Sequence, residues 1–245
     1  MRPHHEEIWL AKEFNDHVPG LGNLTLKLLG LPTEPRPWAN FMVMELLVVI
    51  IIIVLFAFLR PRLSMDRPGK LQHVFEIIRE FVRGESEDAV GHGGSKYLPF
   101  FGTLFIFILI CNLIGIIPGF ESPTINPSVP AGCALATFCY YNLMGFREQG
   151  IGKYLAHFAG PMPFLAPLMV PIELISHMAR PLSLTVRLYA NMYAGEQVTL
   201  VFLSLTYFLV PAVFMGLHVF VSLLQAYIFM LLTMMYVAGA VSHEH

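Results

Sequence analysis

The chain has 245 residues, of which 56% are hydrophobic and 13% charged, and its formal net charge is −2. Soluble domains carry about 25% charged residues, so this composition argues against an ordinary soluble protein. The weak negative charge offers no broad basic surface, so we do not expect nucleic-acid binding. Apolar runs long enough to cross a bilayer recur along the chain, and we therefore predict an all-α polytopic membrane protein.

A single membrane domain is expected over residues 41–240. We expect residues 1–40 to form an extracytoplasmic N-terminal tail and residues 241–245 a short cytoplasmic tail. The apolar runs predict about five membrane helices, at 41–59, 98–118, 128–146, 166–208 and 210–240.

The orientation follows from the basic residues of the loops. Seven of them separate the first two runs, namely Arg60, Arg62, Arg67, Lys70, Arg79, Arg83 and Lys96. The short loop ESPTIN, on the other side of the membrane, has none. The positive-inside rule then places residues 60–97 and 147–163 in the cytoplasm, with the N-terminus outside and the C-terminus inside.

Residues 70–83 show a helical pattern of their own. One face of this segment is apolar and carries Leu71, Val74, Phe75, Ile78, Phe81 and Val82. Charged side chains occupy the other face. This pattern predicts an amphipathic helix lying on the membrane surface, and a helix packed on a soluble partner would show the same pattern.

The last two runs are too long for upright membrane helices. As one helix, residues 210–240 would measure roughly 46 Å, against a hydrocarbon core of about 30 Å. Residues 166–208 are longer still, and Pro167, Pro171 and Pro181 are positions where that helix can bend or break. We therefore predict two long, strongly tilted helices that form a hairpin.

The hairpin contains polar residues where apolar ones are expected. An ionisable group at membrane depth costs about 2.5–3.5 kcal/mol on insertion scales and indicates a functional site by default. Seven residues are therefore candidates for an ion path: Glu173, Ser183, Arg187, Asn191, Glu196, His218 and Gln225. None of them forms a catalytic or metal-binding motif.

The spacing of these residues predicts how they are arranged. Glu173, Arg180 and Arg187 are seven residues apart and share one helix face. On a continuous helix Glu173 lies about 21 Å from Arg187 towards the cytoplasm, and Glu196 lies about 13 Å towards the outside. Because arginine does not deprotonate in proteins, this order is typical of a proton path interrupted by a fixed positive charge.

An antiparallel register can also be predicted. A turn near residues 206–211 places Arg187 opposite Gln225 and Glu196 opposite His218. A slip of one helical turn would remove this agreement. Structural roles compete with it, because Asn191 and Gln225 can serve as interhelical hydrogen bonds.

Other polar residues also have structural interpretations. Arg180 can pair with Glu173 or extend towards the interface, and His218 can be a core histidine with its hydrogen bonds satisfied. We expect Glu45 at the membrane interface and Glu121 in a solvated loop.

The three cysteines lie in apolar segments with no CxxC spacing. We therefore expect Cys111, Cys133 and Cys139 to be small core residues rather than metal ligands.

The stretches RPLSLTVRLYANMYAGE and LLQAYIFMLLTMMY resemble the a subunit of the membrane sector of F-type ATP synthases. Supporting stretches are PGKLQHVFEIIREFV, LPFFGTLFIFILICNLIGIIPG and ESPTIN, and together they cover roughly residues 40–240. The resemblance implies the stator of a rotary proton motor in a bacterial plasma membrane. Its implied partners are the lipid bilayer, a peripheral stalk subunit and a ring of small hairpin subunits that each carry a membrane carboxylate.

The resemblance also implies roles for individual residues. Arg187 holds the ring carboxylate ionised and blocks a direct leak between two half-channels. The residues on the outer half-channel or beside the arginine are Asn191, Glu196, His218 and Gln225. Glu173 matches the cytoplasmic half-channel, and Ser183 matches a polar position one turn before the arginine.

The sequence departs from the family pattern in three places. Ala190 stands where glycine is common before the asparagine, and Pro127 and Pro130 change the loop that follows ESPTIN. Gly115 and Gly119 stand where some members carry acids, so the outer entrance is expected to be lined differently.

The rival interpretations belong to other functional classes. A self-contained secondary ion transporter would show paired repeats, whereas the polar residues here crowd into the last third. An intramembrane metalloprotease would need HExxH, and a haem protein would need deep histidines, of which only His177 and His218 lie in the long runs. Without a GxxxxGK[ST] motif we expect no bound nucleotide, no cofactor and no enzyme activity of this chain alone. The choice between proton and sodium stays open.

Overall fold

The computed structural model describes residues 7–28, 32–63, 69–91, 93–117, 119–150, 152, 166–205 and 209–241. Regular structure within these ranges is helical throughout, as predicted. The α-helices are α1 (Trp9–His17), α2 (Pro19–Leu28), α3 (Asn40–Leu59), α4 (Lys70–Val90), α5 (Leu98–Ile114), α6 (Ser128–Gln149), α8 (Ala166–Leu205) and α9 (Leu209–Val241). Short 3₁₀ turns follow at η1 (Arg60–Arg62), η2 (Gly94–Tyr97) and η3 (Pro123–Ile125).

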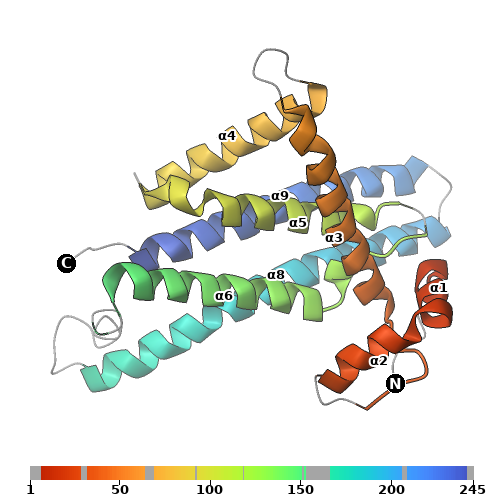
Figure 1. The fold of residues 1–245 in the computed structure, drawn as a ribbon, viewed down its shortest axis with the longest axis horizontal. Helices are drawn as coiled ribbons and strands as arrows, with labels where there is room; N and C mark the ends of the chain where they lie inside the picture. The colour runs from red at the N-terminus through yellow and green to blue at the C-terminus, as the bar shows by residue number, and fades with distance from the viewer. Residues whose placement is uncertain are drawn as a thin grey trace.

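Four helices form the body of the molecule. Helices α5, α6, α8 and α9 run lengthwise beside one another, with their main contacts in the pairs α6–α8, α5–α9, α8–α9 and α6–α9. Helix α3 crosses this group steeply (Figure 1), with α4 near one end of it and α1 and α2 near the other. The helices beyond α4 therefore do not run parallel to α3.

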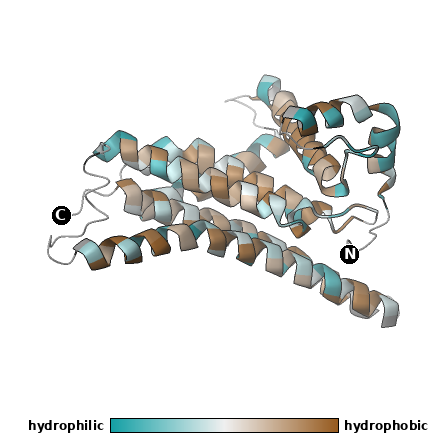
Figure 2. Ribbon diagram, turned by 90° about the horizontal axis from the view of Figure 1, so that it is seen from below, coloured by the Kyte–Doolittle hydropathy of each residue, from teal (hydrophilic) through white to brown (hydrophobic). Residues whose placement is uncertain are grey.

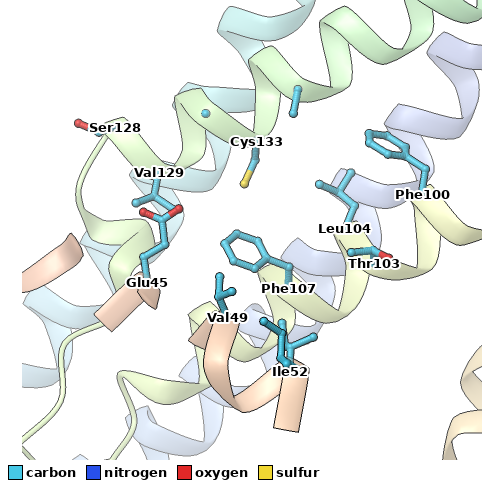
Figure 3. Close-up of a pocket in the computed structure, with 13 residues that line it drawn as sticks. Glu45, Val49, Ile52, Phe100, Thr103, Leu104, Phe107, Ser128, Val129 and Cys133 are labelled. Atoms are coloured by element: carbon cyan, nitrogen blue, oxygen red, sulfur yellow. The ribbon is translucent and has the colours of Figure 1, made fainter. Parts of the chain in front are cut away.

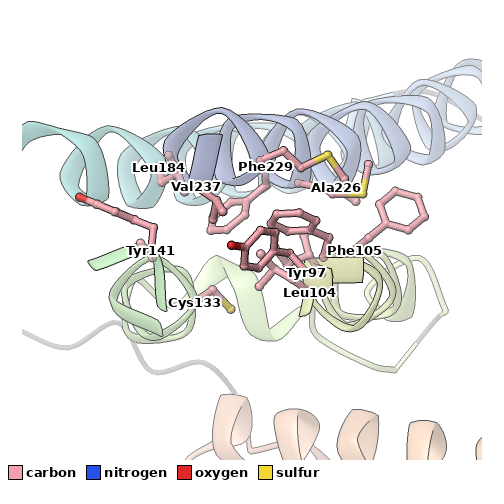
Figure 4. Packing of buried hydrophobic residues seen from close by; sticks show 14 of the residues in the cluster. Tyr97, Leu104, Phe105, Cys133, Tyr141, Leu184, Ala226, Phe229 and Val237 are labelled. Atoms are coloured by element: carbon pink, nitrogen blue, oxygen red, sulfur yellow. The ribbon is translucent and has the colours of Figure 1, made fainter. Parts of the chain in front are cut away.

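The main core lies where the four long helices meet (Figure 4). Its largest fully buried side chains include Phe101 of α5, Tyr141 of α6, Leu188 of α8 and Phe229 of α9. A smaller cluster holds α3 against the end of α5, and it contains Met44, Val48, Cys111 and Ile114. Cys111 and Cys133 are buried as predicted, but Cys139 is exposed, because its position on α6 points away from the bundle.

Many large apolar side chains remain exposed, and Figure 2 shows how hydrophobic residues recur along the bundle helices. Among the described residues, three helices are long and apolar enough to cross a membrane: Asn40–Leu59, Gly94–Ile114 and Ala212–Val241. Helices α6 and α8, which were also expected to cross, are not among the three. The charged residues of α8 lower its hydropathy, although this helix has 40 residues.

Helix α8 passes through Pro171 and Pro181 without a break in its helical assignment. The predicted runs and the helices agree at most ends, but α5 ends at Ile114 rather than at residue 118, and α6 continues to Gln149 rather than ending at residue 146. Residues 206–208 of the predicted turn, residue 118 of the second run and residues 242–245 of the C-terminal tail lie outside the described residues.

The segment before the membrane domain is not an extended tail. Helix α1 packs on α3, and the Asn15 side chain exchanges two hydrogen bonds with the backbone of Trp38, at 3.1 and 3.0 Å. The Trp38 indole N–H donates to the Val18 carbonyl at 2.8 Å. This segment is therefore folded onto the start of α3.

Helix α4 covers the predicted amphipathic segment and continues to Val90. Its Val82 and Ser86 are buried, whereas Leu71, Val74 and Phe81 remain exposed. The Phe81 ring lies against those of Phe105 and Tyr227, so α4 packs on α5 and α9 through one face.

We predict that Gly94→Ala destabilises the corner between α4 and α5. A methyl group at Gly94 would overlap the backbone carbonyl of Ser86, whose hydroxyl donates to the Gly94 carbonyl at 2.9 Å. Crowding of this kind costs about 1–3 kcal/mol, so the midpoint of thermal unfolding of the solubilised protein should fall. Gly102→Ala is the matched control, because its methyl group meets no atom within 4 Å. Equal midpoints for the two variants would contradict the prediction.

Candidate functional site

The polar residues of the last third meet where α8 and α9 pack together. The Asn191 amide donates to Gln225 Oε1 at 2.6 Å, which fixes the register of the two helices. Gln225 is buried within α9 at 2% exposure. The sequence placed Arg187 opposite Gln225, whereas the hydrogen bond is made by the residue one turn further along α8.

The second predicted pair lies within one residue of its expected position. The His218 imidazole hydrogen-bonds the backbone of Gly195, the residue before Glu196. A methyl group at Gly195 would lie 2.9 Å from His218 Nδ1, so only glycine allows this close approach. Glu196 is half-buried beside this contact.

A cavity of about 240 Å³ opens between α8 and α9 at this point. It is lined by Asn191, Ala194, Gly195, Val198, Thr199, Phe214, Leu217, His218 and Val221. Within the described part of the chain, the buried atoms His218 Nε2 and Gln225 Nε2 have no hydrogen-bond partner. Buried polar atoms are normally hydrogen-bonded, so these two atoms mark a polar region within the α8–α9 contact.

Arg187 lies at the edge of the buried stripe of α8. Leu184 and Leu188, on either side of it, are 1% and 0% exposed, while Arg187 itself is half-buried. Among the described residues no hydrogen bond or ion pair to its guanidinium is recorded. Ser183, one turn earlier, is exposed. Arg187 is therefore a half-buried cation with no anionic partner among the described residues.

Glu173 is paired, as one sequence interpretation proposed. Arg180 Nη2 lies 3.8 Å from Glu173 Oε1, and the Arg180 guanidinium stacks 5.5 Å from the Tyr236 ring centroid of α9. Arg180 lies one heptad and Glu173 two heptads from Arg187 on the same helix. The structure thus separates the predicted residues into one group around Gln225 and His218 and another around Glu173.

The sequence interpretation missed a third polar group close to Glu173. His177 is buried, with Nε2 3.0 Å from Asn142 Oδ1 and both ring nitrogens 3.4 Å from the Tyr141 hydroxyl. The signal was available, because His177 falls four residues after Glu173 and hence on a neighbouring helix position. Its partners on α6 could not be identified without knowing how α6 packs against α8.

Two carboxylates, one expected at the membrane interface and one in a solvated loop, are partly buried. Glu45 lines an apolar groove of about 370 Å³ between α3, α5 and α6, and its carboxylate lies beside Val129 (Figure 3). Glu121 was expected in a solvated loop, but it is half-buried and accepts a hydrogen bond from Asn40 Nδ2 at 3.3 Å. Folding of the N-terminal segment onto α3 brings Asn40 to it.

Comparison with known proteins gives a consistent result. A family model described as ATP synthase A chain matches residues 42–238. A protein from Solibacter usitatus named ATP synthase subunit a is 71% identical over 232 residues, 95% of this chain and 100% of the relative. Proteins of the same name from Koribacter versatilis and a Sulfurihydrogenibium species are 47% and 43% identical, covering 99% and 83% of this chain and 99% and 98% of theirs.

Proposed function

Because the chain belongs to the ATP synthase A chain family, and so to the membrane sector of an F-type ATP synthase, we propose that it is the stator that couples proton flow to rotation. The observation that carries the proposal is a cavity lined by Asn191 and His218, where Asn191 also donates a hydrogen bond to the buried Gln225 and lies one helical turn from Arg187. The relatives' shared name supports the same assignment.

In this mechanism protons enter from outside through the cavity at His218 and Glu196. One proton neutralises a carboxylate on a neighbouring ring of small hairpin subunits, which then moves into lipid. After nearly a full turn the carboxylate releases its proton near Glu173 to the cytoplasm. Each elementary charge crossing 100 mV supplies about 2.3 kcal/mol.

Arg187 is the barrier between the two half-channels in this proposal. Its guanidinium has no anion among the described residues, so it can pair with each ring carboxylate in turn and keep it ionised. Because it stays protonated, it also repels a proton that would pass directly from one side to the other.

The ring would pack on the exposed face of α8. This face carries Ser183, Val186, Ala190, Tyr193 and Ala194, which follow helical spacing. Two of the five are alanines, which allow another helix to approach closely. A self-contained transporter would have no need for such an uncovered face next to its central cation.

The proposed membrane arrangement follows the sequence prediction. Helices α3, α5, α6, α8 and α9 cross a bacterial plasma membrane, with α8 and α9 as a long tilted hairpin and α4 on the cytoplasmic surface. The N-terminus lies outside and the C-terminus in the cytoplasm. A peripheral stalk subunit holds this chain still while the ring turns.

We predict that Glu196→Gln lowers ATP-driven proton pumping by about tenfold or more, because glutamine cannot exchange a proton on the outer half-channel. Pumping would be measured in membrane vesicles containing the assembled complex, with the amount of complex checked by immunoblot. Glu80→Gln, an exposed carboxylate on α4, is the control. Wild-type pumping in the Glu196 variant would refute a path through this residue.

A further inference from the structure

A buried chain of polar groups crosses the apolar contact between α5 and α9. Thr124 Oγ1 donates to Asn112 Oδ1 at 2.8 Å, and the Asn112 amide donates to the Ser222 carbonyl at 3.4 Å. The Ser122 hydroxyl lies 2.7 Å from Thr124 Oγ1. All four residues are at most 3% exposed, so their hydrogen bonds are shielded from water and hold the segment firmly.

This chain of polar groups ends at the candidate site. Ser222 lies one helical turn after His218 and three residues before Gln225 on α9. Its hydroxyl also reaches the sulfur of Met192, at 4.0 Å, next to Asn191 on α8. The loop that contains Ser122 and Thr124 is therefore tied to the α8–α9 contact rather than lying free on the surface.

The other end of the chain of polar groups is acidic. Glu121 directly precedes Ser122 and is the single acidic residue between positions 98 and 146. It accepts a hydrogen bond from Asn40 Nδ2 at 3.3 Å, while Asn40 Oδ1 accepts one from the Ile8 backbone N–H at 3.3 Å. The folded N-terminal segment thus holds Asn40, and Asn40 holds the carboxylate.

We propose that Glu121 collects protons at the outer entrance of the path and that Asn40 is its positioning residue; this rests on the proposed function. A fixed carboxylate raises the local concentration of cations, including protons, at the mouth of a path. The amide of Asn112 is not a titratable group, so the buried chain anchors Glu121 and does not itself conduct. This also assigns a role to the N-terminal helices, because they set the position of Asn40.

Other charged groups on the elements around this loop can affect the same measurement. They are Glu7 and Arg36 in the N-terminal segment, Glu45 on α3, and Arg187 and Glu196 on α8. All five stay unchanged in every variant below, so differences in rate between variants report on Glu121 and Asn40.

The test is proton-driven ATP synthesis by the complete complex in vesicles, at constant driving force, over a range of pH on the side of proton uptake. Glu121→Gln should lower the rate by about tenfold at the alkaline end and approach the wild-type rate at the acidic end, where collection no longer limits. Glu121→Asp should restore most of the rate. Glu34→Gln, a change in the exposed part of the N-terminal segment, should have no effect.

Asn40→Ala tests the positioning role separately. It removes the amide that donates to Glu121 and adds no charge, so it should show the same pH-dependent loss. It also serves if the glutamine variant does not assemble. Rates equal to wild type at every pH, or lowered equally at every pH, would overturn the inference. A wild-type complex that makes no ATP from a proton gradient would instead refute the proposed function.

Discussion

Replacing Arg187 with alanine is expected to abolish both ATP-driven proton pumping and proton-driven ATP synthesis while the complex still assembles. The guanidinium is half-buried and has no recorded partner among the described residues, so its removal breaks no internal bond. Packing of α8 depends on Leu184 and Leu188 instead, which are buried. The loss should therefore be one of coupling rather than of folding.

The passive proton leak of the alanine variant separates two roles of the arginine. If Arg187 is the barrier between half-channels, vesicles with the variant complex should dissipate a proton gradient faster than wild-type vesicles. Arg187→Lys should also fail to couple, because an ammonium can lose its proton and lacks the planar donor fork of arginine. Arg79→Ala is the matched control, because it also removes an arginine, from the exposed side of α4. ATP synthesis at the wild-type rate in Arg187→Ala would refute the assignment.

Gly195→Ala is expected to lower proton-coupled synthesis by about tenfold or more, since small displacements of reacting groups can have effects of that size. The added methyl group would lie 2.9 Å from Nδ1 and 3.3 Å from Cε1 of His218, so the imidazole or the helix must move. Either movement changes the cavity next to Glu196.

Gly216→Ala provides a close control for this variant. It makes the same substitution on the other helix of the pair, where the methyl group meets no atom within 4 Å. Both changes gain about 1 kcal/mol of helix propensity, so that benefit cancels in the comparison. Equal ATP synthesis rates in the two variants would show that the close contact between His218 and Gly195 does not affect ATP synthesis.

The sequence was sufficient to predict α3, α5, α6, α8 and α9 from long apolar runs and α4 from its amphipathic pattern, whereas α1 and α2 were not predicted. The Glu173–Arg180 pair was one of two interpretations of Arg180, since a spacing of seven residues places both side chains on one face. The register of α8 against α9 was predicted to within about a turn. The exact register depends on side-chain size where the two helices touch. His218 approaches Gly195 closely, and in that register Asn191 rather than Arg187 lies opposite Gln225.

Other features could not be predicted because they depend on contacts between distant segments. The Asn40–Glu121 bond joins residues 81 positions apart, and the bonds of His177 to α6 span 35 and 36 positions. No local pattern encodes such pairings. The same reason explains Cys139, whose apolar neighbours do not reveal which face of α6 turns outward.

The hydrogen bond between Asn191 and Gln225 has a consequence for a site that gains and loses protons. Both side chains are carboxamides, which carry no charge at any physiological pH. Protonation of Glu196 or His218 therefore removes neither the donor nor the acceptor of this bond. A motor whose moving groups change charge at every step thus has its two central helices aligned by a bond that does not titrate.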